Sequence, residues 1–261
     1  MRKKIILIMG LAGSGKTTLA KKLYFKLKKK TEWINADKVR SSHNDWDFSK
    51  EGILRQSKRI KNLALKSKKD IIITDFICPY KKGRLILKPN LIIWIDTIQK
   101  SRFRKRKIER IFEKPTNYDI RVSTKNSAFW NKIVLDKING FKWNNKNSTA
   151  IMLGRYQPFH LGHERLFIKC LEKVDQVLIC VKDVYKIGDN PYKFNLVKKT
   201  INSRLYKNFK NRFKIIKVPN ITNIFYGRKV GYKIKQIHLE KKIQYISGTK
   251  IRKNLRSKGL L

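Results

Sequence analysis

Acidic residues are scarce in this chain. Only 18 Asp and Glu stand against 64 Lys and Arg in 261 residues, which gives a formal net charge of +46. Such a balance is typical either of a chain that binds nucleic acid or of one whose lysines are spread over solvated faces. The basic residues occur throughout the sequence, and few aromatic residues lie among the densest runs. We therefore expect the charge to be mostly solvated and do not expect a nucleic-acid partner.

Cysteines and long apolar runs are also few. Cys78, Cys170 and Cys180 have no metal-ligand spacing, and an odd number of cysteines predicts reduced thiols in a cytoplasmic protein. No stretch approaches the ~20 apolar residues that span a membrane. The basic start at residues 1–4 imitates a signal peptide, but the apolar run after it is short and enters a glycine-rich loop directly. We expect a cytoplasmic location and no membrane partner.

That loop, residues 10–17, reads Gly-Leu-Ala-Gly-Ser-Gly-Lys-Thr and is a complete phosphate-binding loop. An apolar strand is predicted before it and a helix after it. Glycines let backbone N–H groups turn toward a polyanion, Lys16 adds charge near the β/γ-phosphates, and the Thr17 hydroxyl can reach Mg²⁺. The sequence thus predicts a nucleoside-triphosphate site built from Gly10, Gly13, Ser14, Gly15, Lys16, Thr17 and Thr18.

A second strand-to-helix turn carries two of the four histidines. Residues 154–163 read Gly-Arg-Tyr-Gln-Pro-Phe-His-Leu-Gly-His after an apolar stretch at 150–153. Two strand–loop–helix phosphate sites in one chain predict two active sites.

The predicted elements alternate along both halves. Residues 140–149 are polar and Asn-rich, which is typical of a linker. We predict domains at 1–140 and 150–261 with a linker at 141–149, both of the α/β class with parallel sheets. Strands are expected at 4–9, 31–35, 70–75, 91–96, 150–154, 175–181, 213–218 and 243–246, and helices at 16–29, 50–66, 126–139, 163–173, 192–205 and 249–256.

Four segments of the first half point to a kinase family. After the loop come Asn-Ala-Asp-Lys-Val-Arg at 35–40, Phe48-Ser49, Arg59, and Ile-Cys-Pro-Tyr-Lys-Lys-Gly-Arg at 77–84. Taken together, residues 1–125 resemble the adenylyl-sulfate kinase family of phosphate-loop kinases. The resemblance implies transfer of the ATP γ-phosphate to the ribose 3′-hydroxyl of adenylyl sulfate. It gives catalytic roles to Lys16, Asp37 and Arg40, Mg²⁺ binding to Thr17 and Asp37, and substrate binding to Phe48, Arg59, Ile77, Pro79 and Tyr80.

Five positions depart from that family. Asn35 replaces its first Asp, Ile53 and Gln56 stand where a substrate Arg and Asn fall, Cys78 replaces Ser, and Lys81 replaces Arg. Lysine reproduces a bidentate anion contact of arginine poorly. The acceptor is therefore expected to be a nucleotide-linked acid, with adenylyl sulfate as the first candidate.

The paired histidines resemble the signature of nucleotidylyltransferases, and the wider motif is close to that of nicotinamide-nucleotide adenylyltransferases. A companion motif, Ile-Ser-Gly-Thr-Lys-Ile-Arg at 246–252, follows at the start of the last helix. The resemblance implies a Rossmann-like domain that displaces pyrophosphate from ATP or CTP. His160 and His163 would stabilise the transition state, and nucleotide binding would fall to Gly154, Arg155, Gly162, Ser247, Thr249 and Arg252.

Two further segments allow two interpretations each. The basic stretch 100–110 can be a lid over the triphosphate, through Arg102, Arg104 or Arg106, or a solvated helix face. Residues 226–232 can shape an acceptor pocket or form a plain turn.

The leading hypothesis is a bifunctional enzyme, with sulfate activation as the simplest link between its domains. The alternatives are an NAD-salvage enzyme, with a ribosyl-nicotinamide kinase fused to an adenylyltransferase, and a basic nucleic-acid-binding ATPase.

Overall fold

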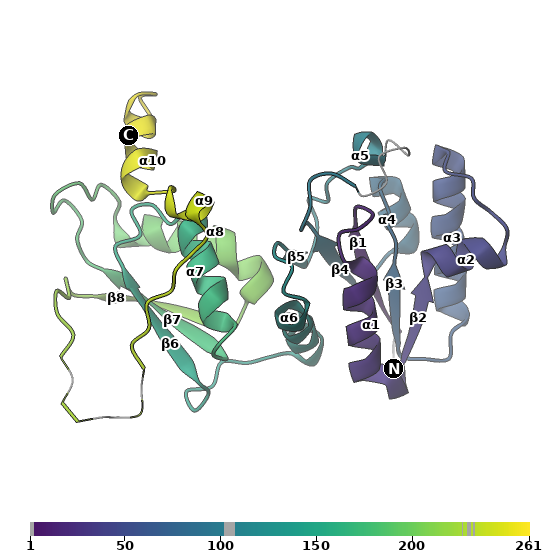
Figure 1. Cartoon of the computed structure of the whole chain (residues 1–261), viewed down its shortest axis with the longest axis horizontal. Coiled ribbons are helices and arrows are strands. Elements are labelled where there is room, and N and C mark those ends of the chain that lie inside the picture. The colour runs from purple at the N-terminus through teal and green to yellow at the C-terminus, as the bar shows by residue number, and fades with distance from the viewer. Residues whose placement is uncertain (1–2, 102–107, 226, 229–230, 232) are drawn as a thin grey trace. The chain divides into compact units, whose positions relative to one another are not determined.

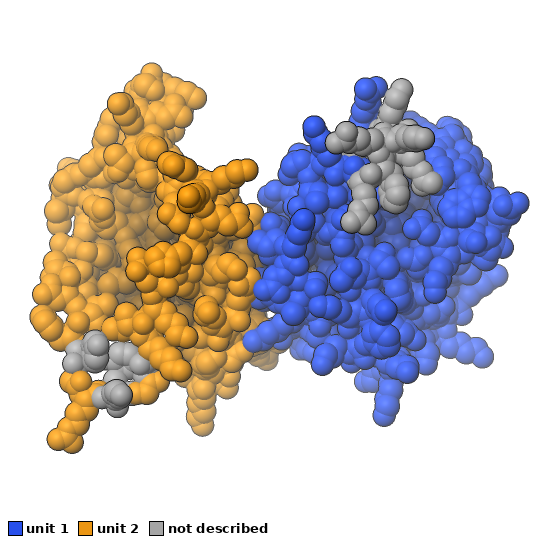
Figure 2. All heavy atoms as spheres, in the orientation of Figure 1, with its two compact units in different colours: residues 1–139 blue, residues 140–261 orange. Residues whose placement is uncertain are grey.

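The computed structural model describes residues 3–101, 108–225, 227–228, 231 and 233–261. The chain divides into two compact units, residues 1–139 and 140–261 (Figure 2). Each is a parallel sheet with helices, as Figure 1 shows. The predicted α/β class with parallel sheets is thus confirmed.

The first unit is built on a five-stranded sheet in the order β2-β3-β1-β4-β5, with every pair parallel. Helix α1 packs against α6, and α3 packs against α4. The strands are β1 (Lys4–Gly10), β2 (Thr31–Asn35), β3 (Ile71–Asp75), β4 (Leu91–Ile95) and β5 (Ile120–Val122). The helices are α1 (Lys16–Leu27), the 3-10 turn η1 (Lys28–Lys30), α2 (Ala36–Ser42), α3 (Lys50–Lys66), α4 (Lys81–Leu87), α5 (Ile108–Ile111) and α6 (Ser127–Asn139).

Strand β1 is the centre of this sheet. Ile6, Leu7, Ile8 and Met9 are fully buried, because side chains on both faces of a central parallel strand are covered. The same burial explains the near-continuous apolar run in β3. The carboxyl ends of β1, β2 and β3 meet at one edge, where ligands bind in open parallel sheets.

The second unit holds a three-stranded parallel sheet in the order β6-β7-β8. Its elements are β6 (Thr149–Gly154), α7 (Leu161–Leu171), β7 (Gln176–Lys182), α8 (Phe194–Phe209), β8 (Phe213–Val218), α9 (Lys241–Gln244) and α10 (Gly248–Arg256). Phe167 of α7 and Phe209 of α8 are fully buried, with ring centroids 5.2 Å apart.

The prediction of a strand at 243–246 is wrong. Residues 241–244 form the short helix α9, and the amides of Gln244 and Tyr245 donate to the carbonyls of Glu240 and Lys241. Two or three apolar residues in a short polar context do not separate a strand from a helical turn, and here the backbone groups bond locally. Among the described residues no helix is long and apolar enough to cross a membrane.

Candidate active sites

The phosphate loop joins β1 to α1 and depends on its glycines. Gly10, Gly13 and Gly15 have φ angles of 147°, 85° and 101°, which residues with a side chain rarely adopt. At Gly10 a Cβ would lie 2.4 Å from the carbonyl oxygen of Ile95, so only glycine lets the loop pass this close to β4. Within the described chain, the buried hydroxyl of Ser14 has no hydrogen-bond partner. An orphaned donor in this loop fits a site that an anion completes.

Lys16 lies inside the loop rather than in solvent. Its side chain is buried, and Nζ donates to the carbonyl of Leu11 at 2.9 Å. Burial lowers the pKa of Lys16 to about 8, while Asp75 and Asp37 act against that shift. The ammonium group therefore stays mostly charged at neutral pH, next to the space where a polyphosphate would bind.

Asp75 is a site residue that the sequence interpretation missed. It ends β3, is almost fully buried, and accepts hydrogen bonds from the Thr17 hydroxyl at 2.8 Å and from Trp33 Nε1 at 2.7 Å. Asn35, its register partner on β2, donates to both carboxylate oxygens at 3.0 and 3.2 Å. Burial raises the pKa of Asp75 against the effect of these bonds. A carboxylate at the end of a buried strand beside the loop strand was the available signal.

Asp37 lies one residue into α2, whose N-cap is Asn35. The Asn35 side chain accepts from the amide of Lys38 at 3.0 Å and donates to Asp75. Asp37 is exposed and faces the same cavity as Lys16 and Thr17. The structure thus brings the predicted base and metal residues together around one opening.

Two cavities flank the phosphate loop, and Gly13 lines both. The α3-side cavity has a volume of about 190 Å³, and the α6-side cavity about 240 Å³. Lys16, Thr17, Asp37, Arg40, Phe48, Ile77 and Pro79, all predicted from the sequence, line the α3-side cavity together with Asp75. Ser14, Gly15 and Thr18 line the α6-side cavity, where Thr97 donates its hydroxyl hydrogen to the Ser14 carbonyl at 2.7 Å.

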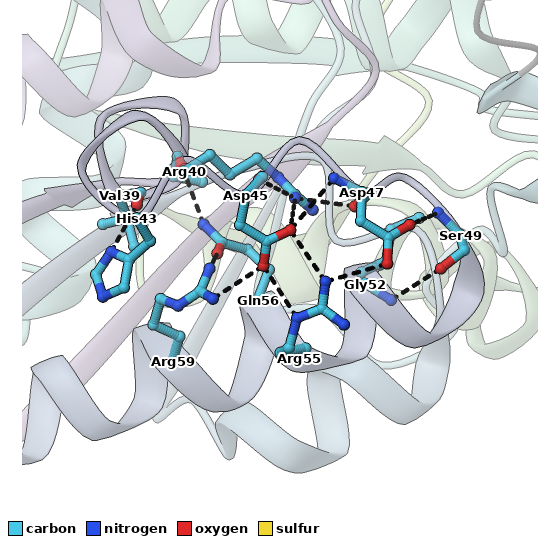
Figure 3. Close-up of polar contacts among 12 residues, drawn as sticks. Val39, Arg40, His43, Asp45, Asp47, Ser49, Gly52, Arg55, Gln56 and Arg59 are labelled. Carbon is cyan, nitrogen blue, oxygen red and sulfur yellow. Dashed lines mark hydrogen bonds and ion pairs between the residues drawn. The ribbon is translucent and has the colours of Figure 1, made fainter.

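Two predicted substrate residues do not line the α3-side cavity. Tyr80 is the N-cap of α4. Arg59 is not among the lining residues either, and its Nη2 lies 2.9 Å from Oδ2 of Asp45 (Figure 3). Arg40 does line the cavity, but its Nη1 donates to the backbone carbonyls of Asp45 and Asp47.

In the second unit the paired histidines form the N-terminus of α7. His160 Nδ1 accepts from the amide of Gly162 at 3.1 Å, and His163 Nδ1 accepts from the amide of His160 at 3.2 Å. A neutral imidazole whose Nδ1 accepts carries its proton on Nε2. Burial, the neighbouring His160 and Arg204 lower the pKa of His163 to about 3, and burial also lowers the pKa of His160. Both rings are therefore neutral Nε2–H donors at physiological pH, with centroids 3.8 Å apart.

Helix α10 meets this turn through Gln157. Arg252 donates from Nη1 to the Gln157 carbonyl, from Nη2 to the Thr249 hydroxyl at 3.2 Å, and from Nε to Asp189 at 2.8 Å. Ser247 caps α10 by accepting from the amide of Lys250. Arg252 therefore holds the companion motif, residues 246–252, against the histidine turn.

Two other predicted residues of the second site lie at the end of β6. At Gly154 a Cβ would lie 2.8 Å from the Tyr156 ring, and Arg155 is exposed. Arg102, Arg104 and Arg106 of the predicted lid lie outside the described residues, as do Tyr226, Lys229, Val230 and Tyr232 of the second segment.

The comparisons with known proteins bear on the first of these sites. Residues 2–95 match the family model of adenylylsulphate kinase. The matched residues run through β4, so they include the phosphate loop, Asp37 and the segment 77–84, but neither α6 nor the second unit. The match supports a nucleotide kinase of the adenylylsulphate kinase type in the first unit. No curated protein matches the chain significantly.

Among solved structures, the chain is similar to APS kinase from Mycobacterium tuberculosis in complex with AMPPNP and APS, at 19% identity and a TM-score of 0.45, over 53% of this chain and 98% of that one. It is also similar to shikimate kinase from Acinetobacter baumannii in complex with shikimate, at 18% identity and a TM-score of 0.40, over 53% and 94%. A gluconokinase from Sinorhizobium meliloti 1021 follows at 13% identity and 0.36, over 47% and 83%. Likenesses this distant assign no substrate.

The departures from the adenylylsulphate kinase motifs gather along the α3-side cavity. Ile53 and Gln56 line it and are buried. Cys78 also lines it, with a φ of 45°, and burial raises the pKa of its thiol to about 12, so it stays neutral. Lys81 is exposed at the start of α4. Three of the five altered side chains, Ile53, Gln56 and Cys78, thus line this cavity.

Proposed function

We propose that the first unit transfers the γ-phosphate of ATP to a hydroxyl of a nucleotide-linked acid, with the 3′-hydroxyl of adenylyl sulfate as the first candidate. One observation carries the proposal: Lys16, Thr17, Asp37 and Asp75 surround one cavity beside a complete phosphate loop. Lys16 would neutralise charge on the transferring group, and Asp37, exposed at the opening, would accept the proton of the attacking hydroxyl.

The residues of this site fit Mg²⁺. The cation prefers oxygen ligands and is held by one or two protein groups together with substrate phosphates. The Thr17 hydroxyl and the Asp75 carboxylate, 2.8 Å apart, and the exposed Asp37 offer such oxygens. Among the described residues no cluster of three His, Cys, Asp or Glu side chains could form an all-protein metal cage. When bound, Mg²⁺ would neutralise charge on the β- and γ-phosphates.

The test is a phosphotransfer assay on the full chain. Supplied with ATP, Mg²⁺ and adenylyl sulfate, the protein should release ADP and form the 3′-phosphorylated nucleotide. Asp37→Asn should lose product formation while still binding ATP. If adenylyl sulfate yields no product while another hydroxyl compound does, the altered residues Ile53 and Gln56 mark a changed acceptor. Absence of ADP release with every acceptor would overturn the proposal.

We propose as a second activity that the other unit transfers a nucleotidyl group from ATP or CTP and releases pyrophosphate. The specific observation is the pair of neutral Nε2–H donors at the start of α7, next to the helix end that carries Ser247 and Thr249. Such donors stabilise charge that develops on phosphoryl oxygens.

This second proposal is tested by pyrophosphate release from ATP and from CTP with several phosphorylated acceptors. Inversion at the α-phosphorus is expected of one in-line displacement, and a trapped phosphohistidine would contradict it. Turnover with nicotinamide mononucleotide, together with phosphorylation of nicotinamide riboside by the first unit, would instead support NAD salvage.

A further inference from the structure

The loop at residues 43–49 joins α2 to α3 and carries Phe48 to the α3-side cavity. Arg40 lies over the Phe48 ring, 4.7 Å from its centroid, and donates from Nη1 to the carbonyls of Asp45 and Asp47 at 2.8 and 2.9 Å. The conformation of this loop therefore determines the position of the Phe48 ring in the cavity lining.

Asp45 ties the loop to α3, as Figure 3 shows. Its carboxylate accepts from Nε and Nη2 of Arg55, both at 3.0 Å, and from Nη2 of Arg59 at 2.9 Å. These bonds hold the pKa of Asp45 well below its usual range. Arg55 also donates to Asp47 at 3.1 Å. Arg55 and Arg59 of α3 thus both donate hydrogen bonds to the Asp45 carboxylate.

Of these two arginines, only Arg59 also bonds a buried residue among the described contacts. Arg59 donates from Nη1 to Oε1 of Gln56 at 2.7 Å, and Gln56 donates from Nε2 to the carbonyl of Ala36 at 3.0 Å. Gln56 is 2% exposed, so water does not compete for these bonds. Ala36 is the first residue of α2 and precedes Asp37. A chain of bonds therefore runs from Asp45 through Arg59 and Gln56 to the backbone next to Asp37.

We propose that Arg59 and Gln56 are positioning residues: they tie the 43–49 loop, which carries Phe48, to the start of α2, and this link fixes Asp37 in the place where it meets the acceptor hydroxyl. This inference rests on the proposed phosphotransfer. It assigns Arg59 to a contact within the protein rather than to the substrate.

The chain supplies its own control. Arg55 and Arg59 lie one helical turn apart and both bond Asp45, but only Arg59 bonds Gln56 among the described contacts. Arg55→Met and Arg59→Met remove the same charge from the same carboxylate. Only Arg59→Met also removes the donor to Oε1 of the buried Gln56. A buried acceptor left without a hydrogen bond lowers stability more than a lost exposed bond does. Arg59→Lys keeps the charge but lacks the planar fork that spans Asp45 and Gln56.

The experiment compares Arg59→Met, Arg55→Met, Gln56→Leu and the Arg59→Met/Gln56→Leu double variant in the full chain. The first readout is amide hydrogen exchange of residues 36–49, which needs no turnover. Arg59→Met should accelerate exchange in both α2 and the loop, whereas Arg55→Met should accelerate it in the loop alone. Equal patterns in the two variants would overturn the link to α2.

The second readout is kinetic. Arg59→Met should lower kcat/KM for the acceptor by about 10- to 100-fold, the usual cost of a misplaced catalytic group, and leave the KM for ATP within a factor of about two. Because Arg59 acts through Gln56, the double variant should lose little more than Gln56→Leu alone. Additive losses, or an equal loss in Arg55→Met, would overturn the proposal. Absence of phosphotransfer by the unsubstituted chain would overturn the proposed function instead.

Discussion

The phosphate loop of the first unit and the histidine turn of the second occupy equivalent places, each between a parallel strand and the helix that follows it. They differ in how the helix begins. Gly15 caps α1 in a left-handed conformation without any side-chain hydrogen bond, whereas His160 and His163 cap α7 with their own ring nitrogens. The first helix therefore offers its backbone amides to a ligand. In the second helix, the amide of Gly162 in the first turn already donates to His160. The donors available there are the Nε2–H groups of the histidines.

The two turns also differ in charge. Lys16 carries an ammonium balanced by Asp75 and Asp37, while both histidines are neutral and lie near Arg204, which opposes their protonation. In the two proposed sites, anion binding would rest on a fixed charge at the phosphate loop and on oriented neutral donors at the histidine turn. The two sites should then respond differently to substitution and to pH.

The largest expected effect is the loss of the fixed charge. Lys16→Ala should lower ADP formation by at least 10²–10³-fold, because the transferring group loses its buried cation, and should leave pyrophosphate release unchanged. Both products are measured in one assay, with the exposed Lys26→Ala on the same helix as the control. Loss of both activities in Lys16→Ala would contradict the proposal of two independent sites.

Removing one oriented donor should cost about as much in the other unit. His160→Ala or His163→Ala should lower the turnover of pyrophosphate release by ~10²–10³-fold, the cost of one donor to a developing oxyanion. Nucleotide affinity should change far less, since the interaction strengthens in the transition state. The exposed His238→Ala is the matched control, and a purely affinity-based loss would contradict the assigned role.

A smaller effect is expected at Asp75, whose carboxylate accepts the hydrogen bond of the Thr17 hydroxyl. Asp75→Asn should raise the Mg²⁺ concentration needed for half-maximal ADP formation by about 10- to 100-fold, as for groups that orient a metal ligand. Asp70→Asn, at the residue just before the other end of β3, should leave the Mg²⁺ dependence unchanged. An unaltered dependence in Asp75→Asn would show that Thr17 needs no carboxylate to hold it.

The smallest effect concerns pH and stability. The pKa of His163 falls from its usual 6.5 to about 3 in the folded protein, so the unfolded chain binds the extra proton first as the solution is acidified. The contribution of His163 to stability is present above pH 6.5 and is lost as the pH falls from 6.5 toward 3. Urea unfolding of the second unit, followed through Trp143, should show this loss, and His163→Gln should flatten it. An identical slope in the variant would refute the neutral-histidine assignment.

The elements with a strong apolar signal could be predicted from the sequence, and those that depend on contacts could not. Runs such as 4–9 and 91–96 became central strands because covered parallel strands are apolar throughout. The short β5, with one exposed residue between two buried ones, has no such signal, and the apolar residues near 243 were wrongly read as a strand. Motif residues could be placed from spacing alone. The roles of Asp75 and Arg59 could not, because a carboxylate at a strand end and an arginine on a helix acquire their partners only when β2, β3 and the 43–49 loop come together.

Gly13 lines both the α3-side and the α6-side cavity, and this arrangement bears on the order in which the two substrates bind. With one loop between two cavities, the proposed donor would bind on one side and the acceptor on the other, and neither substrate would have to leave before the other binds. Phosphotransfer should then pass through a ternary complex without a phosphorylated enzyme, and double-reciprocal plots at several fixed acceptor concentrations should intersect rather than run parallel.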